Sequence, residues 1–240
     1  MKAVLFRQHG GPDTLSYEDL PTPTIGSEEV LVRVKACALN HLDIWIRQGN
    51  PAYPIPLPHV SGSDVSGIVE QAGSRVEGVT VGQRVFVSPG ISCWKCEQCL
   101  AGRDNLCRSY GLLGAMTHGG YAEYVKVPFR NVLPIPENLS FEQAAAFPLV
   151  SVTASHMLFA LAGLHHGETV LIMGAGSGVG MMAVQMAKLA GARVMTTVGS
   201  DDKIPKAVTL GAEPASTQPR EKWAEAVRRW TEGAGAKSDF

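Results

Sequence analysis

The 240-residue sequence lacks the features of proteins that act on membranes or nucleic acids. No apolar run approaches the roughly 20 residues needed to span a bilayer, and Arg7 and His9 interrupt the amino terminus before a secretory apolar core can form. Lysine and arginine are scattered and the formal net charge is −1, so there is no basic patch for nucleic acid or an anionic membrane. These absences predict a cytoplasmic protein whose partners are small molecules.

Cysteine is scarce, yet four of the five cysteines lie close together. In the segment 90–107 they have the spacing C-x2-C-x2-C-x7-C, at Cys93, Cys96, Cys99 and Cys107. Cytosolic thiols stay reduced, so this clustering indicates metal ligands rather than disulfides. Four thiolates fill every position of a tetrahedral zinc ion and leave none for water or substrate. The sequence therefore predicts one structural Zn²⁺.

Hydrophobic periodicity divides the chain into two halves. Up to about residue 137, alternating segments cut by Pro- and Gly-rich turns predict a β-rich barrel or sandwich. Ser140 and Gln143 then form a capping-box-like helix start. Beyond residue 167 apolar strands and helices alternate, which is typical of a parallel, doubly wound sheet. We expect an α/β protein with domains at 1–137 and 167–240, joined by a helical region at 138–166.

A glycine-rich turn follows the first strand of the second half, in ETVLIMGAGSGVG. Such a strand–turn–helix unit lets backbone N–H groups approach a pyrophosphate, because glycine has no Cβ to block it. The literal G-x-G-x-x-G pattern fails at Ala175 and Ser177, but small residues preserve most of the clearance. A purely structural turn is the alternative interpretation. The residues expected to bind a dinucleotide here are Gly174, Ala175, Gly176, Ser177, Gly178, Val179 and Gly180.

The following strand, ARVMTTV, bears on the choice of dinucleotide. An NAD site places an acidic residue near the end of this strand, where it binds the ribose hydroxyls. Here the strand ends in Val198-Gly199-Ser200, and Asp201 falls past it. Ser200 and Lys203 are available to a 2′-phosphate, so we expect NADP(H) rather than NAD(H). Lys203 equally suits a solvated position on the next helix.

These features together resemble the medium-chain dehydrogenase/reductase superfamily, which contains zinc alcohol dehydrogenases and quinone oxidoreductases. The resemblance covers the whole chain and depends on KACALNHLDIWIRQG, PHVSGSDVSGIVE, VGQRVFV, the cysteine loop, GGYAEYV, AAAFPLVSVTA and GAGSGVG. It implies a GroES-like catalytic domain at 1–137, a Rossmann domain at 167–240, and a cleft between them for nicotinamide and substrate. In that pattern Thr153 would approach the nicotinamide.

The chain departs from the alcohol dehydrogenases at the positions of their catalytic zinc. Where that family has a cysteine, a histidine and a further cysteine, this chain has Asn40, Ser63 and a residue near Leu149 that is not cysteine. Asn40 is what the zinc-free quinone oxidoreductases have there. The resemblance therefore implies an NAD(P)H-dependent reductase of quinones or α,β-unsaturated carbonyls, in which hydrogen-bond donors stabilise the substrate oxygen.

For this reaction we expect Asn40 and Tyr53 to donate hydrogen bonds, with His41 or His59 relaying a proton. Two alternatives stay open. In the first, Cys37, His41 and His59, which lie near the lost ligand positions, assemble a substitute zinc site, as in an alcohol dehydrogenase. The chain also ends where GAGAKSDF begins a fourth strand, which suggests a truncated, impaired fragment for which the homo-oligomer expected of a complete chain is doubtful.

Overall fold

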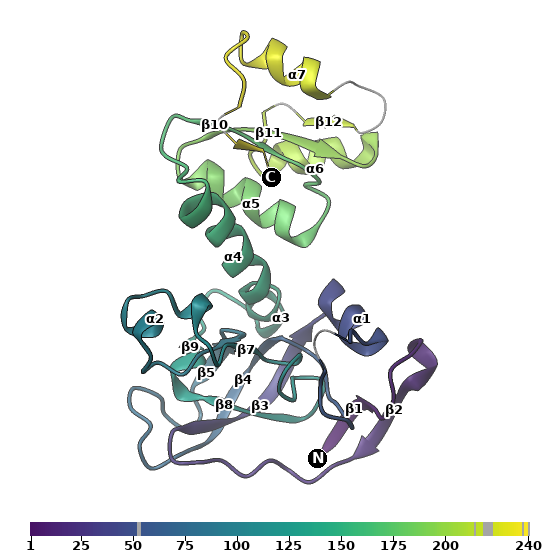
Figure 1. Cartoon of the computed structure of the whole chain (residues 1–240), viewed down its shortest axis with the longest axis vertical. Coiled ribbons are helices and arrows are strands. Elements are labelled where there is room, and N and C mark those ends of the chain that lie inside the picture. Colours follow the sequence, from purple (N-terminus) through teal and green to yellow (C-terminus); the bar gives the residue numbers. More distant parts are fainter. Residues whose placement is uncertain (52–53, 214, 218–222, 237, 240) are drawn as a thin grey trace. The chain divides into compact units, whose positions relative to one another are not determined.

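The computed structural model describes residues 1–51, 54–213, 215–217, 223–236 and 238–239. The chain divides into two compact units, Met1–Leu149 and Val150–Phe240 (Figure 1). This division falls inside the segment 138–166, for which the sequence predicts a helical link. In the described residues no helix combines the length and the apolar character needed to cross a membrane.

The first unit is built on a five-stranded antiparallel sheet with strand order β8-β3-β4-β5-β9. Its strands are β3 (Glu29–Ala38), β4 (Asp64–Ala72), β5 (Arg84–Val87), β8 (Tyr124–Pro128) and β9 (Val132–Pro134). Alternate residues point to the same face of a strand, so valines two apart, such as Val30 and Val32, enter one core. The predicted β-rich first half is confirmed.

Shorter elements surround this sheet, and several of them were not predicted from the sequence. Two small antiparallel pairs join β1 (Lys2–Phe6) to β2 (Leu15–Asp19) and β6 (Gly90–Ile91) to β7 (Gly111–Leu112). The helices are α1 (His41–Gln48), α2 (Glu97–Leu100) and α3 (Phe141–Ala145), with 3₁₀ turns at Pro12–Thr14, Asp104–Leu106 and Phe129–Asn131. Helix α3 begins with the predicted capping box, since the Ser140 hydroxyl accepts the Gln143 N–H at 3.2 Å.

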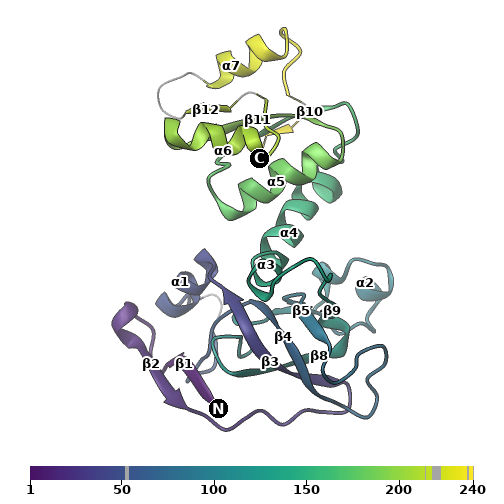
Figure 2. The same cartoon turned by 180° about the vertical axis from the view of Figure 1, so that it is seen from behind.

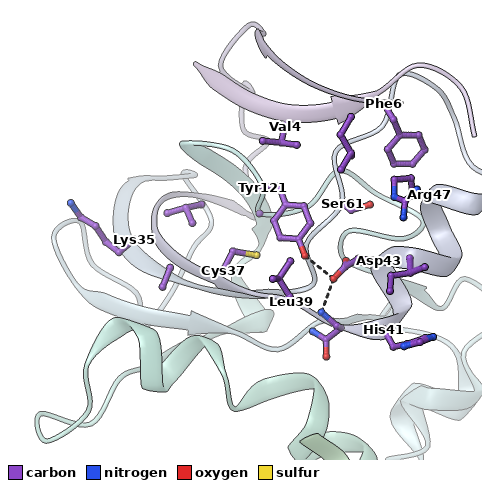
Figure 3. A pocket seen from close by; sticks show the side chains of 16 residues that line it. Val4, Phe6, Lys35, Cys37, Leu39, His41, Asp43, Arg47, Ser61 and Tyr121 are labelled. Atoms are coloured by element: carbon purple, nitrogen blue, oxygen red, sulfur yellow. Dashed lines mark hydrogen bonds between the residues drawn. The ribbon is translucent and has the colours of Figure 1, made fainter. Parts of the chain in front are cut away.

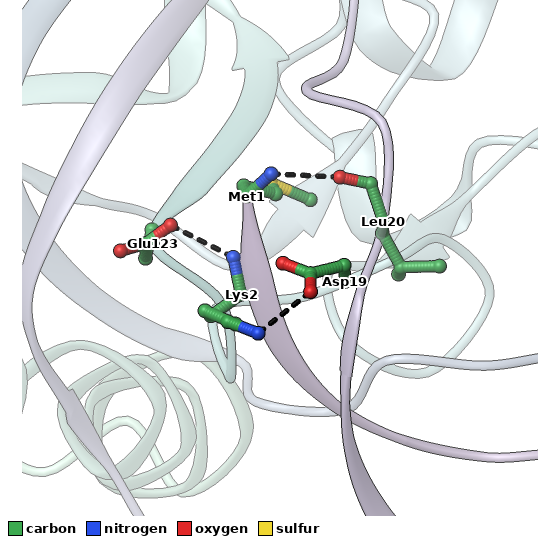
Figure 4. A network of polar contacts seen from close by, with 5 residues as sticks. All are labelled: Met1, Lys2, Asp19, Leu20 and Glu123. Atoms are coloured by element: carbon green, nitrogen blue, oxygen red, sulfur yellow. Dashed lines mark hydrogen bonds and ion pairs between the residues drawn. The ribbon is translucent and has the colours of Figure 1, made fainter.

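Polar contacts hold the first strand in place (Figure 4). The Lys2 backbone N–H donates to the Glu123 carboxylate at 2.7 Å, and the Met1 amino group donates to the Leu20 carbonyl at 2.7 Å. The Lys2 side chain pairs with Asp19 at 2.6 Å, but both are exposed and such a pair contributes little to stability. The buried apolar side chains of β1 therefore account for most of its anchoring.

The second unit contains a parallel sheet with strand order β12-β11-β10-β13. Its strands are β10 (Thr169–Ile172), β11 (Arg193–Val198), β12 (Ala215–Thr217) and β13 (Ser238–Asp239). The helices are α4 (Pro148–Ser155), which spans the division between the units, α5 (Gly178–Leu189), α6 (Ile204–Thr209) and α7 (Trp223–Trp230), with a π-helical turn at His156–Leu161 and a 3₁₀ turn at Asp201–Lys203. The predicted parallel α/β half is confirmed.

Strand alternation explains why helices cover both faces of this sheet. Val170 and Ile172 of β10 pack into a core with the apolar side chains of α5 and α6. Leu171, which lies between them, points the other way and packs with Met195 against α7. Figure 2 shows α5 and α6 on one face of the sheet and α7 on the other. A strand buried on both faces is expected to be apolar at successive positions, as Val170, Leu171 and Ile172 of β10 are.

Candidate functional site

The four clustered cysteines form a metal-ligand set in the first unit. We call Cys93, Cys96, Cys99 and Cys107 the cysteine cluster; their sulfur atoms all lie within 4.8 Å of one another. Cys96 precedes α2, Cys99 lies in it, and Cys107 follows the 3₁₀ turn at Asp104–Leu106. Four converging sulfurs with no disulfide suit tetrahedral zinc, and no ligand position is left open. The predicted cysteine cluster is therefore assembled by the fold.

Backbone groups around the cluster favour thiolates. N–H groups of Lys95 and Cys96 donate to the Cys93 sulfur and lower the pKa of this thiol to about 6. Burial acts in the opposite direction on Cys99 and raises the pKa of its thiol to about 12. Trp94 takes the left-handed conformation, with φ at 57°, so that the chain turns sharply between the first two cysteines. This strained turn indicates a loop shaped around a ligand.

A second polar cluster lies where α1 begins. The Asn40 side-chain amide donates to the Asp64 carboxylate at 2.8 Å, and the Leu149 backbone N–H donates to the other carboxylate oxygen at 2.7 Å. Asp64 is 1% exposed. Burial raises the pKa of this carboxyl to about 6, against the opposing effect of the two hydrogen bonds. Asn40 is therefore held by a buried acid with a raised pKa.

Asp43 holds the backbone in place at the start of α1. Its carboxylate accepts the Asn40 backbone N–H at 2.7 Å, the Tyr121 hydroxyl at 2.7 Å and the Gly62 N–H at 3.3 Å. Burial is the main cause that raises the pKa of Tyr121, and its bond to Asp43 adds to the effect, so the phenol stays protonated and donates. We call Asn40, Asp43, Asp64 and Tyr121 the amide–carboxylate network.

Asn40, Asp43 and Tyr121 of this network line a hollow of about 790 Å³ in the first unit. Figure 3 shows the Tyr121 hydroxyl pointing at Asp43 in its wall. The same carboxylate accepts the Asn40 backbone N–H. Most of the remaining wall is apolar, including Phe6 and Leu39. The hydroxyl of Ser61, a residue 5% exposed that also lines the hollow, has no hydrogen-bond partner within the described structure. Apolar walls with a few fixed polar groups are typical of small-molecule sites.

The other predicted catalytic residues are dispersed. His41 is exposed at the start of α1 and stacks edge-on against Trp45, with ring centroids 4.8 Å apart. His59 is completely buried, makes a 3.0 Å hydrogen bond with the Gly114 carbonyl, and has its pKa lowered mainly by burial. Tyr53 lies outside the described residues. Of the residues described, only the cysteine cluster brings three or more His, Cys, Asp or Glu ligands together, so Cys37, His41 and His59 do not assemble the substitute zinc site.

In the second unit, the glycine turn has the geometry of a phosphate-binding loop. Gly174 has φ at +75°, a conformation that favours glycine, and a Cβ on Gly180 would lie 2.3 Å from the Gly174 carbonyl oxygen. Ser177 stands where the literal pattern has glycine and caps α5, because its hydroxyl accepts the Gly180 N–H at 3.0 Å. Gly178 and Val179 form the first turn of α5, and N–H groups at such a position can bind an anion.

Two predicted cofactor residues lie near this turn, with different surroundings. The Lys203 ammonium would be 3.9 Å from a Cβ placed on Gly176, so its charge lies over the glycine turn. Ser200 donates instead to Asp202 and lowers the pKa of that carboxyl. Thr153 lies in α4 and is half-buried. The turn and Lys203 fit a dinucleotide phosphate, whereas the Ser200 hydroxyl is already bonded.

The sequence did not predict the other three members of the amide–carboxylate network. Asp43 had a local signal, because an acidic residue three positions after an Asn cap is a helix-start pattern. Asp64 and Tyr121 had none, since they lie 24 and 78 residues from the groups they contact. Such pairings depend on strand order rather than on local sequence.

Two family models match the chain. Residues 26–137 match the Alcohol dehydrogenase GroES-like domain, and residues 178–238 match the Zinc-binding dehydrogenase model. A solved structure described as an NAD-dependent alcohol dehydrogenase superposes with a TM-score of 0.95 at 51% identity, over 100% of this chain and 70% of that one.

Curated relatives include both types of enzyme that the sequence suggests. An alcohol dehydrogenase of Geobacillus stearothermophilus is 37% identical over 89% of this chain, and a quinone oxidoreductase of Mus musculus is 34% identical over 84% of it. The chain spans 62% of the length of the first relative and 54% of the second.

Proposed function

The chain belongs to the medium-chain dehydrogenase/reductase superfamily, and we propose that it serves NADPH-dependent reduction of quinones or α,β-unsaturated carbonyls. The observation that carries the proposal is the amide–carboxylate network, of which Asn40, Asp43 and Tyr121 line the hollow. Asn40, a neutral carboxamide, replaces a metal-ligating cysteine there and is already engaged by a carboxylate. Neither Asn40 nor Ser63 supplies the thiolate or imidazole that zinc prefers.

In this proposal each residue has a stated part. When bound, a nicotinamide would supply a hydride for the β-carbon of the substrate. Asn40 donates a hydrogen bond to the substrate oxygen as negative charge develops on it. Tyr53 is a second proposed donor, and His41, exposed beside the hollow, is the proposed proton relay. The apolar wall excludes water, which strengthens these hydrogen bonds.

For the cofactor we propose the glycine turn as the pyrophosphate site. The N–H groups of Gly178 and Val179 face the pyrophosphate, and Lys203 places a positive charge beside it or beside a 2′-phosphate. No carboxylate stands at the end of β11, which supports NADP(H) over NAD(H). Three further statements stay predictions. They are that Thr153 lies near the nicotinamide, that the protein is cytoplasmic, and that the whole protein is a homo-oligomer.

The cysteine cluster has a supporting part in this proposal. We propose that it holds one structural zinc, because four thiolates saturate the ion and leave no site for a substrate. Zinc would fix the loop at residues 90–107, which has only short elements of its own. The proposed chemistry then depends on hydrogen-bond donors rather than on this metal.

Alcohol oxidation is the second candidate, favoured by the 51% identity to a structure described as an alcohol dehydrogenase. One set of measurements separates the two functions: the zinc content of the purified chain, titration with NADPH and NADH, and turnover with a quinone and with an alcohol. Reductase function predicts about one zinc per chain and tighter NADPH binding. About two zinc ions per chain, with alcohol oxidation lost on mild chelation, would favour the dehydrogenase instead.

A further inference from the structure

We propose that Ser92 is a positioning residue for the cysteine cluster, and that it holds Cys107 where the fourth metal ligand is needed. The inference rests on the proposed function, in which this cluster binds one structural zinc. It goes further by naming a residue that is not itself a ligand and yet sets the zinc affinity of the site.

Local chain geometry brings together three of the four cysteines, but not the fourth. Cys93, Cys96 and Cys99 follow one another at intervals of three residues, and α2 begins directly after Cys96 and contains Cys99. Cys107 comes later and follows the 3₁₀ turn at Asp104–Leu106. A longer connecting segment loses more conformational freedom when its ends are brought together. Cys107 is therefore the ligand whose place depends most on contacts between distant parts of the loop.

Ser92 supplies such a contact from a buried position. The residue is 7% exposed, and its hydroxyl donates to the Asp104 carbonyl oxygen at 3.1 Å, with the Asp104 carboxylate a second acceptor at 3.3 Å. The same carbonyl oxygen accepts the backbone N–H of Cys107 at 3.0 Å. A carbonyl oxygen has two lone pairs, so it can accept both hydrogen bonds at once. The Asp104 carbonyl therefore connects Ser92 to the backbone of the fourth ligand.

The neighbouring residue joins the same two segments. The Cys93 backbone N–H donates to the Cys107 sulfur at 3.4 Å. At the base of the loop, β6 pairs with β7, so the chain before Ser92 is already held beside the chain after Cys107. The Ser92 hydroxyl is thus one contact in a continuous connection between the two sides of the loop. A single substitution can remove this contact without changing a metal ligand.

Loss of the Ser92 hydroxyl is expected to weaken metal binding through Cys107. Hydrogen-bond partners that orient metal ligands typically contribute a factor of about 10–100 to metal affinity. Without the hydroxyl, the Asp104 carbonyl no longer ties the 3₁₀ turn to the segment before Cys93. Cys107 can then move away from the other three sulfurs, which keep their local arrangement.

The zinc affinity of the chain tests the inference. The purified wild-type chain and its variants are titrated with Zn²⁺ in competition with a chromophoric chelator. We expect Ser92→Ala to bind zinc about tenfold more weakly or worse, and Ser92→Thr, which keeps a hydroxyl, to stay close to wild type. Ser109→Ala is the matched control, because Ser109 is an exposed serine near Cys107, and it should bind zinc as wild type does. Equal affinity of Ser92→Ala and wild type, or equal weakening by Ser92→Ala and Ser92→Thr, would overturn the proposal.

Alkylation of individual cysteines shows whether Ser92 acts through Cys107. The zinc-loaded chains are treated briefly with iodoacetamide, and mass spectrometry of peptides identifies the modified cysteines. In Ser92→Ala we expect Cys107 to be modified before the other three ligands, because it leaves the metal most often. Cys37 lies outside the cluster and reports unfolding of the first unit, so its modification should not change. Equal modification of all four ligands, or faster modification of Cys37, would indicate a general loss of structure and overturn the positioning role.

The zinc site and the role of Ser92 can fail separately. A wild-type chain that takes up no zinc would refute the proposed zinc site and this inference with it. A wild-type chain that binds zinc, together with a Ser92→Ala variant that binds it equally tightly, would leave the zinc site standing and refute the inference alone.

Discussion

The cysteine cluster and the amide–carboxylate network are two polar clusters in one unit, and they are completed in different ways. The cluster brings together four sulfurs that suit a metal ion. The network needs no added ion, because Asp43 and Asp64 accept hydrogen bonds from Asn40, Tyr121 and the backbone. A tetrathiolate site can stabilise a loop with little core of its own. A self-satisfied network with one half-buried amide can instead orient a ligand.

The largest expected effect is at the cysteine cluster. Cys107→Ser removes one of four ligands, and structural zinc sites in small peptides contribute about 10–16 kcal/mol to folding. We expect the variant to lose zinc and to have a much lower Tm. Cys37→Ser is the matched control, since Cys37 lies outside the cluster, and it should keep the wild-type zinc content. Full zinc content in Cys107→Ser would contradict this assignment.

The network is expected to make stability depend on pH. The pKa of Asp64 is raised to about 6 from an ordinary value of 3.8, so the folded state binds this proton more tightly than the unfolded state. The contribution of Asp64 to the free energy of unfolding is complete below about pH 4 and is lost as the pH rises through about 6. The free energy of unfolding decreases by about 3 kcal/mol over this range. Urea denaturation at several pH values measures it. Asp64→Asn should show a flatter pH profile over this range, and an unchanged slope would count against the raised pKa.

Asn40→Ala tests the network as a ligand contact. Loss of one donor to a developing oxyanion costs about 10²–10³ in turnover, so we expect at least a hundredfold slower oxidation of NADPH by an enone. The affinity for NADPH should be unchanged, because the glycine turn is untouched. Turnover within a factor of about two of wild type would remove Asn40 from the proposed chemistry.

Lys203→Ala extends the comparison to the second unit. Removing this charge should weaken NADPH binding about tenfold and leave NADH binding nearly unchanged if the ammonium faces a 2′-phosphate. Equal weakening of both cofactors would place Lys203 at the pyrophosphate instead. Lys206→Ala, a change on the exposed part of α6, is the matched control. Fluorescence titration measures all of these affinities.

The smallest expected effect concerns the cap of α5. Ser177→Ala removes the acceptor of the Gly180 N–H and should lower the free energy of unfolding by about 1 kcal/mol. Ser177→Asn, which keeps a capping oxygen, should recover most of that loss. Urea denaturation of the chain distinguishes the two, and equal stability of all three proteins would contradict the capping role.

The amino-acid sequence alone determined the features that depend on local spacing. The cysteine spacing predicted the metal-ligand set, and the alternation of apolar residues predicted the antiparallel first half and the parallel second half. The Ser140 capping box and the glycine turn were also predictable, because their partners lie within a few residues. In the capping box and in the glycine turn, the interacting groups are close in the sequence, so local chain geometry brings them together.

Only the tertiary structure decided the contacts across the fold. The pairing of Asn40 with Asp64 requires β4 to lie beside the end of β3, and Tyr121 reaches Asp43 from 78 residues away. The same packing separates Cys37, His41 and His59 and buries Asp64, which raises its pKa. Burial and long-range hydrogen bonds depend on which strands become neighbours, and local sequence does not specify that order.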